Sequence, residues 1–171
     1  PRVVIIHKSA TFHEEEKKAV EAVNKEKRSF EYCLIHVEQI NPYRFFLKNA
    51  PSYMPYRGTV IFDSDRKNKF FVLTTGNAIV EQHKPPKAIT KIGTPRPIEI
   101  NIEENTSHYK LREIAKQMLL LTKLDWNTTD VAIRIPITIK YSNRAANLAP
   151  YIPSIEVNGG IVNIGDLRDL L

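Results

Sequence analysis

The chain has 171 residues, of which 42% are hydrophobic and 26% charged, a balance typical of one globular domain with a sizeable core. It contains no apolar run of the roughly 20 residues that a membrane span requires, no signal-peptide pattern, and too few cysteines for an internal disulfide. We therefore expect a cytoplasmic protein with no membrane contact. The net charge of +6 and the pI near 9.4 favour an anionic partner such as nucleic acid, although many basic proteins bind none.

The first predicted elements are a strand and a helix. Arg2–His7 is apolar almost throughout, which predicts an inner strand. Thr11–Glu14 has the T-x-x-E pattern of a capping box, so we expect a helix from there to about Arg28. A buried strand directly after Pro1 also leads us to expect that this sequence is the C-terminal piece of a longer protein.

A second strand and a hairpin are predicted next. Phe30–Glu38 predicts the strand, and Asn41–Arg57 predicts a loop with three prolines and several aromatic residues. Gly58–Phe62 and Phe70–Thr75 predict an antiparallel hairpin around a polar turn. A further loop, His83–Pro97, is rich in proline and lysine.

The second half of the chain alternates strands and helices. Ile98–Ile102 alternates apolar and polar residues and predicts a half-buried strand, and Ser107–Leu124 predicts a helix with one apolar stripe. That stripe consists of Leu111, Ile114, Met118 and Leu121. Val131–Ile139 predicts a strand interrupted by Pro136, and Ser142–Leu148 predicts a short helix. Together these elements predict an α/β fold.

The residues of the C-terminal tail predict a hairpin and a last helical turn. The hairpin spans Ile155–Ile164 around two glycines, and the helical turn spans Gly165–Leu171.

Several chemistries lack the residues that they need. The sequence has neither of the glycine-rich motifs that cradle phosphates, and its five histidines are scattered. Cys33 lies in a buried strand, which favours a structural thiol over a nucleophile. Asp63 and Asp65 fit turn chemistry better than a catalytic pair, and Glu14–Glu16 fit a helix start. For Asp125 we favour a local turn role over a catalytic one.

Basic residues at the ends of loops and strands are better candidates for function. Phosphate recognition needs hydrogen-bond donors spread over many ångströms, and this set has that spread. Its members are Arg44, Arg57, Arg96, Arg134, Lys140 and Arg144. Each one taken alone is also explained as a solvated surface charge.

Six short segments resemble the PIWI domain of Argonaute proteins, especially the prokaryotic ones. They occur in the family's order over nearly the whole chain: RVVIIHKS, PYRGT, FVLTTG, GTPRP, LTKLDWN and RIPITIKYSNRAANL. The resemblance implies an RNase H-like α/β fold, with a mixed sheet and flanking helices. Residues 1–171 would then form the C-terminal part of one PIWI domain, whose N-terminal part lies elsewhere.

The resemblance also implies a catalytic site that lacks one of its metal-binding acids. Argonautes that cut use three acids and a fourth His, Asp or Asn to hold two divalent metals. Lys8 falls in the slot of the third acid and Asn143 in the fourth slot. An ammonium group repels a metal, so we expect no catalytic residue here and a non-cleaving Argonaute. Such a protein binds guide and target and leaves destruction to an accompanying effector protein.

The family's guide contacts map onto six positions by the same resemblance. They are Arg44, Arg96, Asn127, Thr128, Arg134 and Lys140. The terminal carboxylate of Leu171 fits a divalent-cation site (Mg²⁺ or Mn²⁺) at the guide 5′ phosphate. A packed terminal leucine with a solvated carboxylate explains Leu171 equally well.

Three functions therefore remain open. The first is a binding module for a DNA or RNA guide and its complementary target, joined to the rest of an Argonaute chain. The second is a metal-dependent guided endonuclease with an RNase H-like active site. The third is an interaction domain that binds only protein, which binding of a 5′-phosphorylated oligonucleotide would separate from the first.

Overall fold

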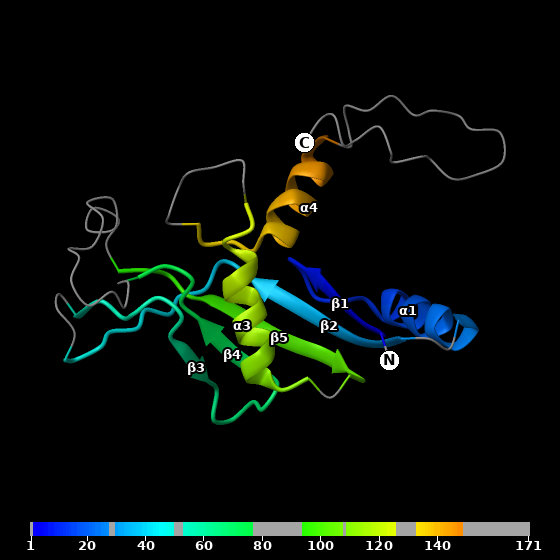
Figure 1. Ribbon diagram of the computed structural model, residues 1–171, viewed down its shortest axis with the longest axis horizontal. Coiled ribbons are helices and arrows are strands. Elements are labelled where there is room, and N and C mark those ends of the chain that lie inside the picture. Colours follow the sequence, from blue (N-terminus) through cyan, green and yellow to red (C-terminus); the bar gives the residue numbers. More distant parts are fainter. Residues whose placement is uncertain are drawn as a thin grey trace.

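A five-stranded mixed sheet forms the centre of the protein (Figure 1). The computed structural model describes residues 2–27, 30–49, 53–76, 94–107, 109–125 and 133–148. The strands are β1 (Arg2–Lys8), β2 (Phe30–Glu38), β3 (Val60–Phe62), β4 (Lys69–Val72) and β5 (Ile98–Asn105), and the helices are α1 (Glu14–Lys27), α3 (Leu111–Leu121) and α4 (Ile137–Leu148). The strand order is β1-β2-β5-β4-β3, with β1 parallel to β2 and the other neighbours antiparallel.

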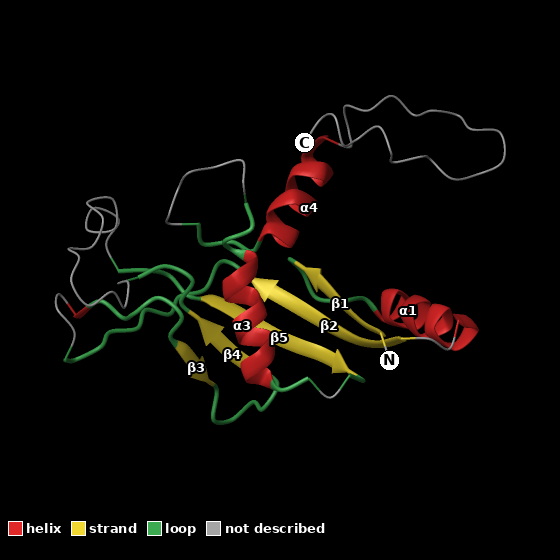
Figure 2. Cartoon of the chain, viewed as in Figure 1, coloured by secondary structure: helices red, strands yellow, loops and turns green. Residues whose placement is uncertain are grey.

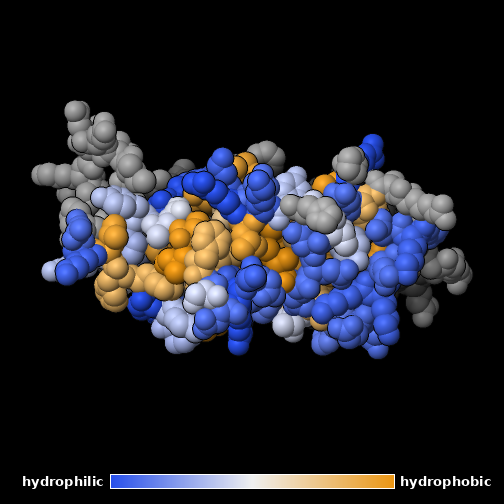
Figure 3. All heavy atoms as spheres, turned by 90° about the horizontal axis from the view of Figure 1, so that it is seen from below, coloured by the Kyte–Doolittle hydropathy of each residue, from blue (hydrophilic) through white to orange (hydrophobic). Residues whose placement is uncertain are grey.

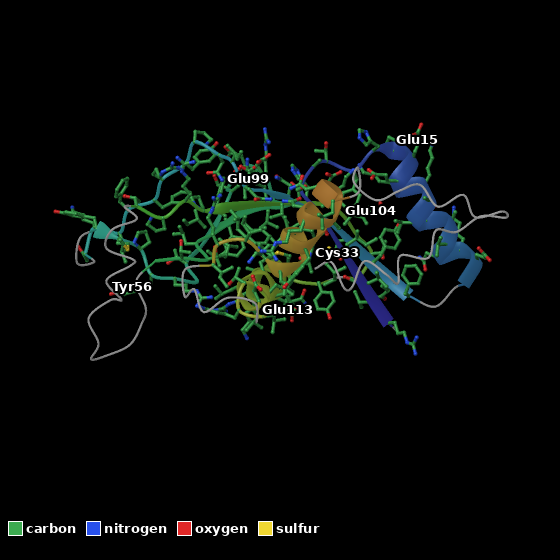
Figure 4. The ribbon with its side chains drawn as sticks, turned by 90° about the horizontal axis from the view of Figure 1, so that it is seen from above. Glu15, Cys33, Tyr56, Glu99, Glu104 and Glu113 are labelled. Carbon is green, nitrogen blue, oxygen red and sulfur yellow. The ribbon has the colours of Figure 1, made fainter. Side chains whose placement is uncertain are left out.

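Helices cover both faces of this sheet. Alternate side chains of a strand point to opposite faces, and in the middle of β2, at Tyr32–Ile35, the side chains on both faces are buried. Ile35 packs with Ile114 and Met118 of α3 in the larger core, whereas Leu34 packs with Phe12 before α1 in a smaller one. Figure 4 shows the same division, with Glu113 of α3 on one side of the sheet and Glu99 of β5 on the other. The predicted α/β fold is therefore confirmed.

One face of the molecule differs in hydropathy along its length. The face seen in Figure 3 is hydrophobic near its middle, in the half that holds β3, β4 and α3, and hydrophilic in the half nearer to α1. None of the helices in the described part of the chain combines the length and the apolar composition that spanning a membrane requires.

Most predicted strands are confirmed, and the hairpin turn with them. β2 has the predicted bounds, β3 and β4 form the predicted antiparallel pair, and β5 begins at Ile98 but continues to Asn105. In the turn, the Asp63 carboxylate accepts the backbone N–H groups of Asp65 (2.9 Å) and Arg66 (3.3 Å). Turn chemistry is thus the observed role of Asp63.

Two predictions at the start of the chain are wrong. β1 is not an inner strand but the edge of the described sheet, because β2 is its only partner there, and Val4 is 40% exposed. The capping box is not Thr11–Glu14, because the helix begins only at Glu14. Glu16 instead accepts the backbone N–H of His13 (2.7 Å), whose carbonyl accepts the N–H of Lys17. The carboxylate three residues into the helix therefore completes the cap.

Helix α3 is shorter than predicted but has the predicted buried stripe. It starts at Leu111 rather than at Ser107, because the Glu113 carboxylate accepts the backbone N–H of Lys110 (3.0 Å) and fixes the first turn there. It ends at Leu121, where the Thr122 hydroxyl donates to the Leu119 carbonyl (2.7 Å). Ile114 and Met118 are fully buried, and Leu111 and Leu121 pack beside them.

The strand predicted for Val131–Ile139 is wrong where the structure describes it. Ile137 begins α4, so the helix predicted for Ser142–Leu148 starts five residues earlier. The carbonyl of Pro136 accepts the N–H groups of Ile139 (3.1 Å) and Lys140 (3.0 Å). A proline costs no hydrogen bond at that position, because the first N–H groups of a helix have no partner within it. The prediction for Ile155–Ile164 lies outside the described residues, as does most of His83–Pro97.

Candidate nucleic-acid interface

The predicted site residues gather at one edge of the sheet. The carboxyl ends of β1, β2 and β4 meet there with the start of β5, since β5 runs antiparallel to β2 and β4 (Figure 2). We call Arg44, Arg96 and Arg134 the arginine corner. We call His7–Ser9 with Thr138 and Asn143 the β1–α4 junction.

Buried polar contacts hold the three segments of the arginine corner together. Asn41 is only 8% exposed; its side-chain amide donates to the carbonyl of Pro97 (3.1 Å), and its side-chain oxygen accepts the backbone N–H of Tyr43 (3.2 Å). The guanidinium of Arg134 donates to the Gln39 carbonyl, just beyond β2. These contacts join the segment just before Arg44 to the residue after Arg96 and to Arg134 itself.

Thr74 fixes the backbone of the third arginine. Its buried hydroxyl donates to the carbonyl of Arg134 (2.6 Å), and its own carbonyl accepts Nε of Arg57 (2.8 Å). Arg57 also donates to the Thr122 hydroxyl (3.1 Å), so this arginine ties the end of β4 to the end of α3. Sequence patterns identified neither Asn41 nor Thr74, because their roles depend on contacts far along the chain.

The arginine corner concentrates positive charge. Among the described residues, no carboxylate forms an ion pair with any of its three guanidinium groups. Burial lowers the pKa of Arg134, and the charges of Arg96 and Arg44 lower this pKa further. Its Nε is buried and has no hydrogen-bond partner within the described part of the chain. Guanidinium groups present forked donors that match phosphate oxygens, so this arrangement suits a polyanion.

The β1–α4 junction contains neutral or paired groups instead. Nδ1 of His7 shares a hydrogen bond with the Thr138 hydroxyl (2.9 Å), and the Ser9 hydroxyl donates to Oδ1 of Asn143 (3.4 Å). Burial lowers the pKa of His7 to about 4, so its imidazole is neutral at neutral pH. The structure thus brings the Lys8 segment and Asn143 together.

Lys8 is held by an ion pair and a backbone contact. Its ammonium group donates to the Glu16 carboxylate (2.5 Å) and to the Thr11 carbonyl (3.2 Å), and the Lys8 side chain is 27% exposed. This ion pair lowers the pKa of Glu16. In the described ranges, no group of three or more His, Cys, Asp or Glu side chains could hold a metal ion.

Lys140 also has a carboxylate partner. Its ammonium group pairs with Asp125, whose side chain is 1% exposed and also accepts the Tyr141 hydroxyl (3.4 Å). Asp125 therefore has a contact beyond the turn role predicted for it, because its carboxylate reaches α4. This pair links the end of α3 to the first turn of α4. Lys140 remains a predicted guide contact, but its charge is already partly neutralised.

Some of the remaining residues singled out in the sequence lie outside the described ranges, and the others have contacts or burial of their own. Asn127, Thr128 and Leu171 lie outside the described residues. Arg144 lies over the ring of Tyr141 on α4, 5.6 Å from its centroid. Cys33 is fully buried, and burial raises the pKa of its thiol to about 11, as expected of a structural cysteine.

Solved structures of prokaryotic Argonautes are similar to this chain. The Argonaute of Clostridium butyricum, bound to a guide DNA and a 19-mer target DNA, has a TM-score of 0.66 and 22% identity over 90% of this chain. The Argonaute of Marinitoga piezophila has a TM-score of 0.54 and 20% identity, both with a 5′-OH guide RNA and target DNA (86% of this chain) and with the guide RNA alone (85%). The sequence matches no protein-family model and no curated protein.

These similarities establish the fold. The chain has the RNase H-like α/β fold of an Argonaute PIWI domain. It spans about a fifth of each of those Argonautes: 18% of the Clostridium protein and 19% of the Marinitoga protein.

Proposed function

We propose that this chain is the PIWI part of a non-cleaving prokaryotic Argonaute. It binds the phosphates of a guide strand and admits a complementary target, which base pairing selects. The arginine corner carries this proposal, because it gathers three cations without carboxylate partners among the described residues. A phosphate backbone offsets their mutual repulsion and supplies acceptors for their donors. The similarity to Argonautes that bind guide and target supports the same proposal.

The proposal includes partners and further contacts. Asn127, Thr128 and Lys140 would extend the guide contacts beyond the arginine corner. The Leu171 carboxylate would hold a divalent cation against the guide 5′ phosphate, where that cation supplies positive charge. The rest of an Argonaute chain would complete the guide channel in the cytoplasm, and an effector protein would act on the bound target.

The ion pair of Lys8 supports the lack of cutting. A two-metal site needs acidic ligands around both ions. At the position where the resemblance expects the third acid, Lys8 presents an ammonium group that is already bound to Glu16. A metal ion there would meet a cation in place of a ligand.

A binding and cutting assay tests the proposal. We expect the intact protein to bind a labelled 5′-phosphorylated oligonucleotide, and the loaded protein to retain a complementary target but not a scrambled one. We expect the target to stay intact in Mg²⁺ and in Mn²⁺. Failure to bind any oligonucleotide would contradict the proposal and favour a domain that binds only protein.

The contact between Ser9 and Asn143 favours a second function, a guided endonuclease. Asn143 can ligate a metal, and it lies at the junction where Argonaute sites bind metal by resemblance. Target cutting by the unmodified protein at one fixed distance from the guide 5′ end would establish this alternative. Cutting that appears only after Lys8→Asp would exclude it for the natural protein.

A further inference from the structure

The loop beside the arginine corner combines cations with aromatic rings. From Gln39 to Thr59 the sequence has no Asp or Glu, but it has three cations and five aromatic residues. Two of those aromatic residues, Phe46 and Tyr53, are 66% and 61% exposed. Exposed rings within a basic segment are typical of surfaces that bind single-stranded nucleic acid.

Alternation along this loop places Phe46 on the side of Arg44. The rings of Tyr43 and Phe45 both pack against Phe71 of β4, with centroids 4.9 Å and 5.5 Å away. These two rings lie nearly parallel to each other, at an interplanar angle of 8°, as expected for residues i and i+2 of an extended chain. Arg44 and Phe46 therefore project from the opposite side.

The base of this loop is anchored. Lys69 lies 5.9 Å from the Tyr43 centroid and 5.3 Å from the Phe71 centroid, and its ammonium group pairs with Glu99 (2.8 Å). The Asn41 contacts described above fix the chain just before Tyr43. Phe46 is thus exposed on a segment whose neighbouring residues are held in place. Binding a ligand there would therefore cost less conformational entropy.

We propose that Phe46 stacks on a nucleobase of the strand whose phosphates the arginine corner binds. Arg44 binds the phosphate backbone of the strand. Phe46, two residues further along the same side of the loop, stacks on the face of a base. Stacking on one ring tolerates any base, so this contact adds affinity without sequence preference. The inference rests on the proposed function and adds a base-stacking site to it.

Substitutions of Phe46 in the intact protein test the stacking. We expect Phe46→Ala to weaken binding of a 5′-phosphorylated single strand by about five- to a hundredfold, whereas Phe46→Trp keeps the affinity. Phe62→Ala is the matched control, because Phe62 is 51% exposed but is followed by Asp63 rather than flanked by cations. We expect that control to bind like the unmodified protein.

A scan with abasic nucleotides identifies the stacked base. The unmodified protein should lose affinity when one particular base is removed, and Phe46→Ala should be insensitive to that removal. If the unmodified protein binds the strand but Phe46→Ala binds it equally well, the stacking proposal is wrong and the proposed function stands. If no variant binds, the proposed function itself fails. Loss of a protein partner with unchanged strand binding would identify Phe46 as a protein contact instead and would also overturn the proposal.

Discussion

The arginine corner and the β1–α4 junction lie at the same edge of the sheet but differ in how their charges are paired. The arginine corner holds three guanidinium groups without carboxylate partners in the described part of the chain, and Arg134 is half-buried among them. At the junction, His7 is kept neutral by burial and Lys8 is bound to Glu16. A cation without a carboxylate partner can bind an external anion, whereas a cation in an ion pair mainly stabilises the fold. The arginine corner is thus a candidate binding surface, whereas the charged groups of the junction have a structural role.

The largest expected effect comes from removing two arginines of the corner. Arg44→Ala with Arg96→Ala should weaken oligonucleotide binding at least about a hundredfold, since each charge-assisted hydrogen bond is worth about 1.5–3 kcal/mol. Fluorescence anisotropy at fixed salt measures the loss. Arg66→Ala with Lys67→Ala is the matched control, because these cations lie in the exposed turn between β3 and β4. An equal loss of affinity in both double variants would mean that binding depends on the net charge of the protein and not on the arginine corner.

The neutral His7 of the junction predicts a stability that depends on pH. Its pKa is about 4 in the folded protein, against about 6.5 for a histidine in an unfolded chain, so the unfolded chain takes up the proton first as the pH falls. Stability from this group is complete above pH 6.5 and decreases toward pH 4, by roughly 3 kcal/mol at most. Urea unfolding at several pH values measures it. His7→Gln should flatten the profile, and an unchanged slope would contradict the assignment.

The pair of Asp125 and Lys140 predicts a smaller loss of stability. Asp125→Ala leaves Lys140, whose side chain is 26% exposed, without its carboxylate partner, so we expect a loss of about 2 kcal/mol, less than for a fully buried pair. The urea midpoint measures the loss, and Asp65→Ala in the exposed turn is the control. Coupling between Asp125→Leu and Lys140→Met in a double-mutant cycle would confirm a direct contact, whereas additive effects would not.

The smallest effect is expected at Lys8. Its ion pair with Glu16 is partly exposed on both sides, so Lys8→Met should cost less than about 1 kcal/mol of stability. Oligonucleotide affinity should not change. A large loss of affinity would instead place Lys8 on the binding surface and remove the difference between the two regions.

The sequence predicted the fold well where local patterns decide it. The alternation in β5, the hairpin of β3 and β4 and the apolar stripe of α3 all follow from spacing alone. It misjudged Ile137–Ile139, because β-branched residues favour strands locally. In the structure, the Pro136 carbonyl accepts the first hydrogen bonds of the helix, and Ile139 is buried in the core (1% exposed) from a helical position.

The candidate site was only partly predictable. Family resemblance selected Arg44, Arg96 and Arg134 by position, but their convergence depends on Asn41 and Thr74, which bond to residues far along the chain. The same limit hid the partners of Lys8 and Lys140. Residue types indicate which groups carry charge, while tertiary contacts determine which charges are already paired.

The most direct test of the account is the salt dependence of binding in the two regions. Each phosphate contact contributes about 0.7–0.9 to the slope of log affinity against log salt, so Arg44→Ala with Arg96→Ala should reduce that slope by roughly 1.5. Lys8→Met should leave it unchanged. Slopes that fall equally for the arginine pair and for Lys8, or that stay unchanged for both, would contradict the claim that the arginine corner binds the strand.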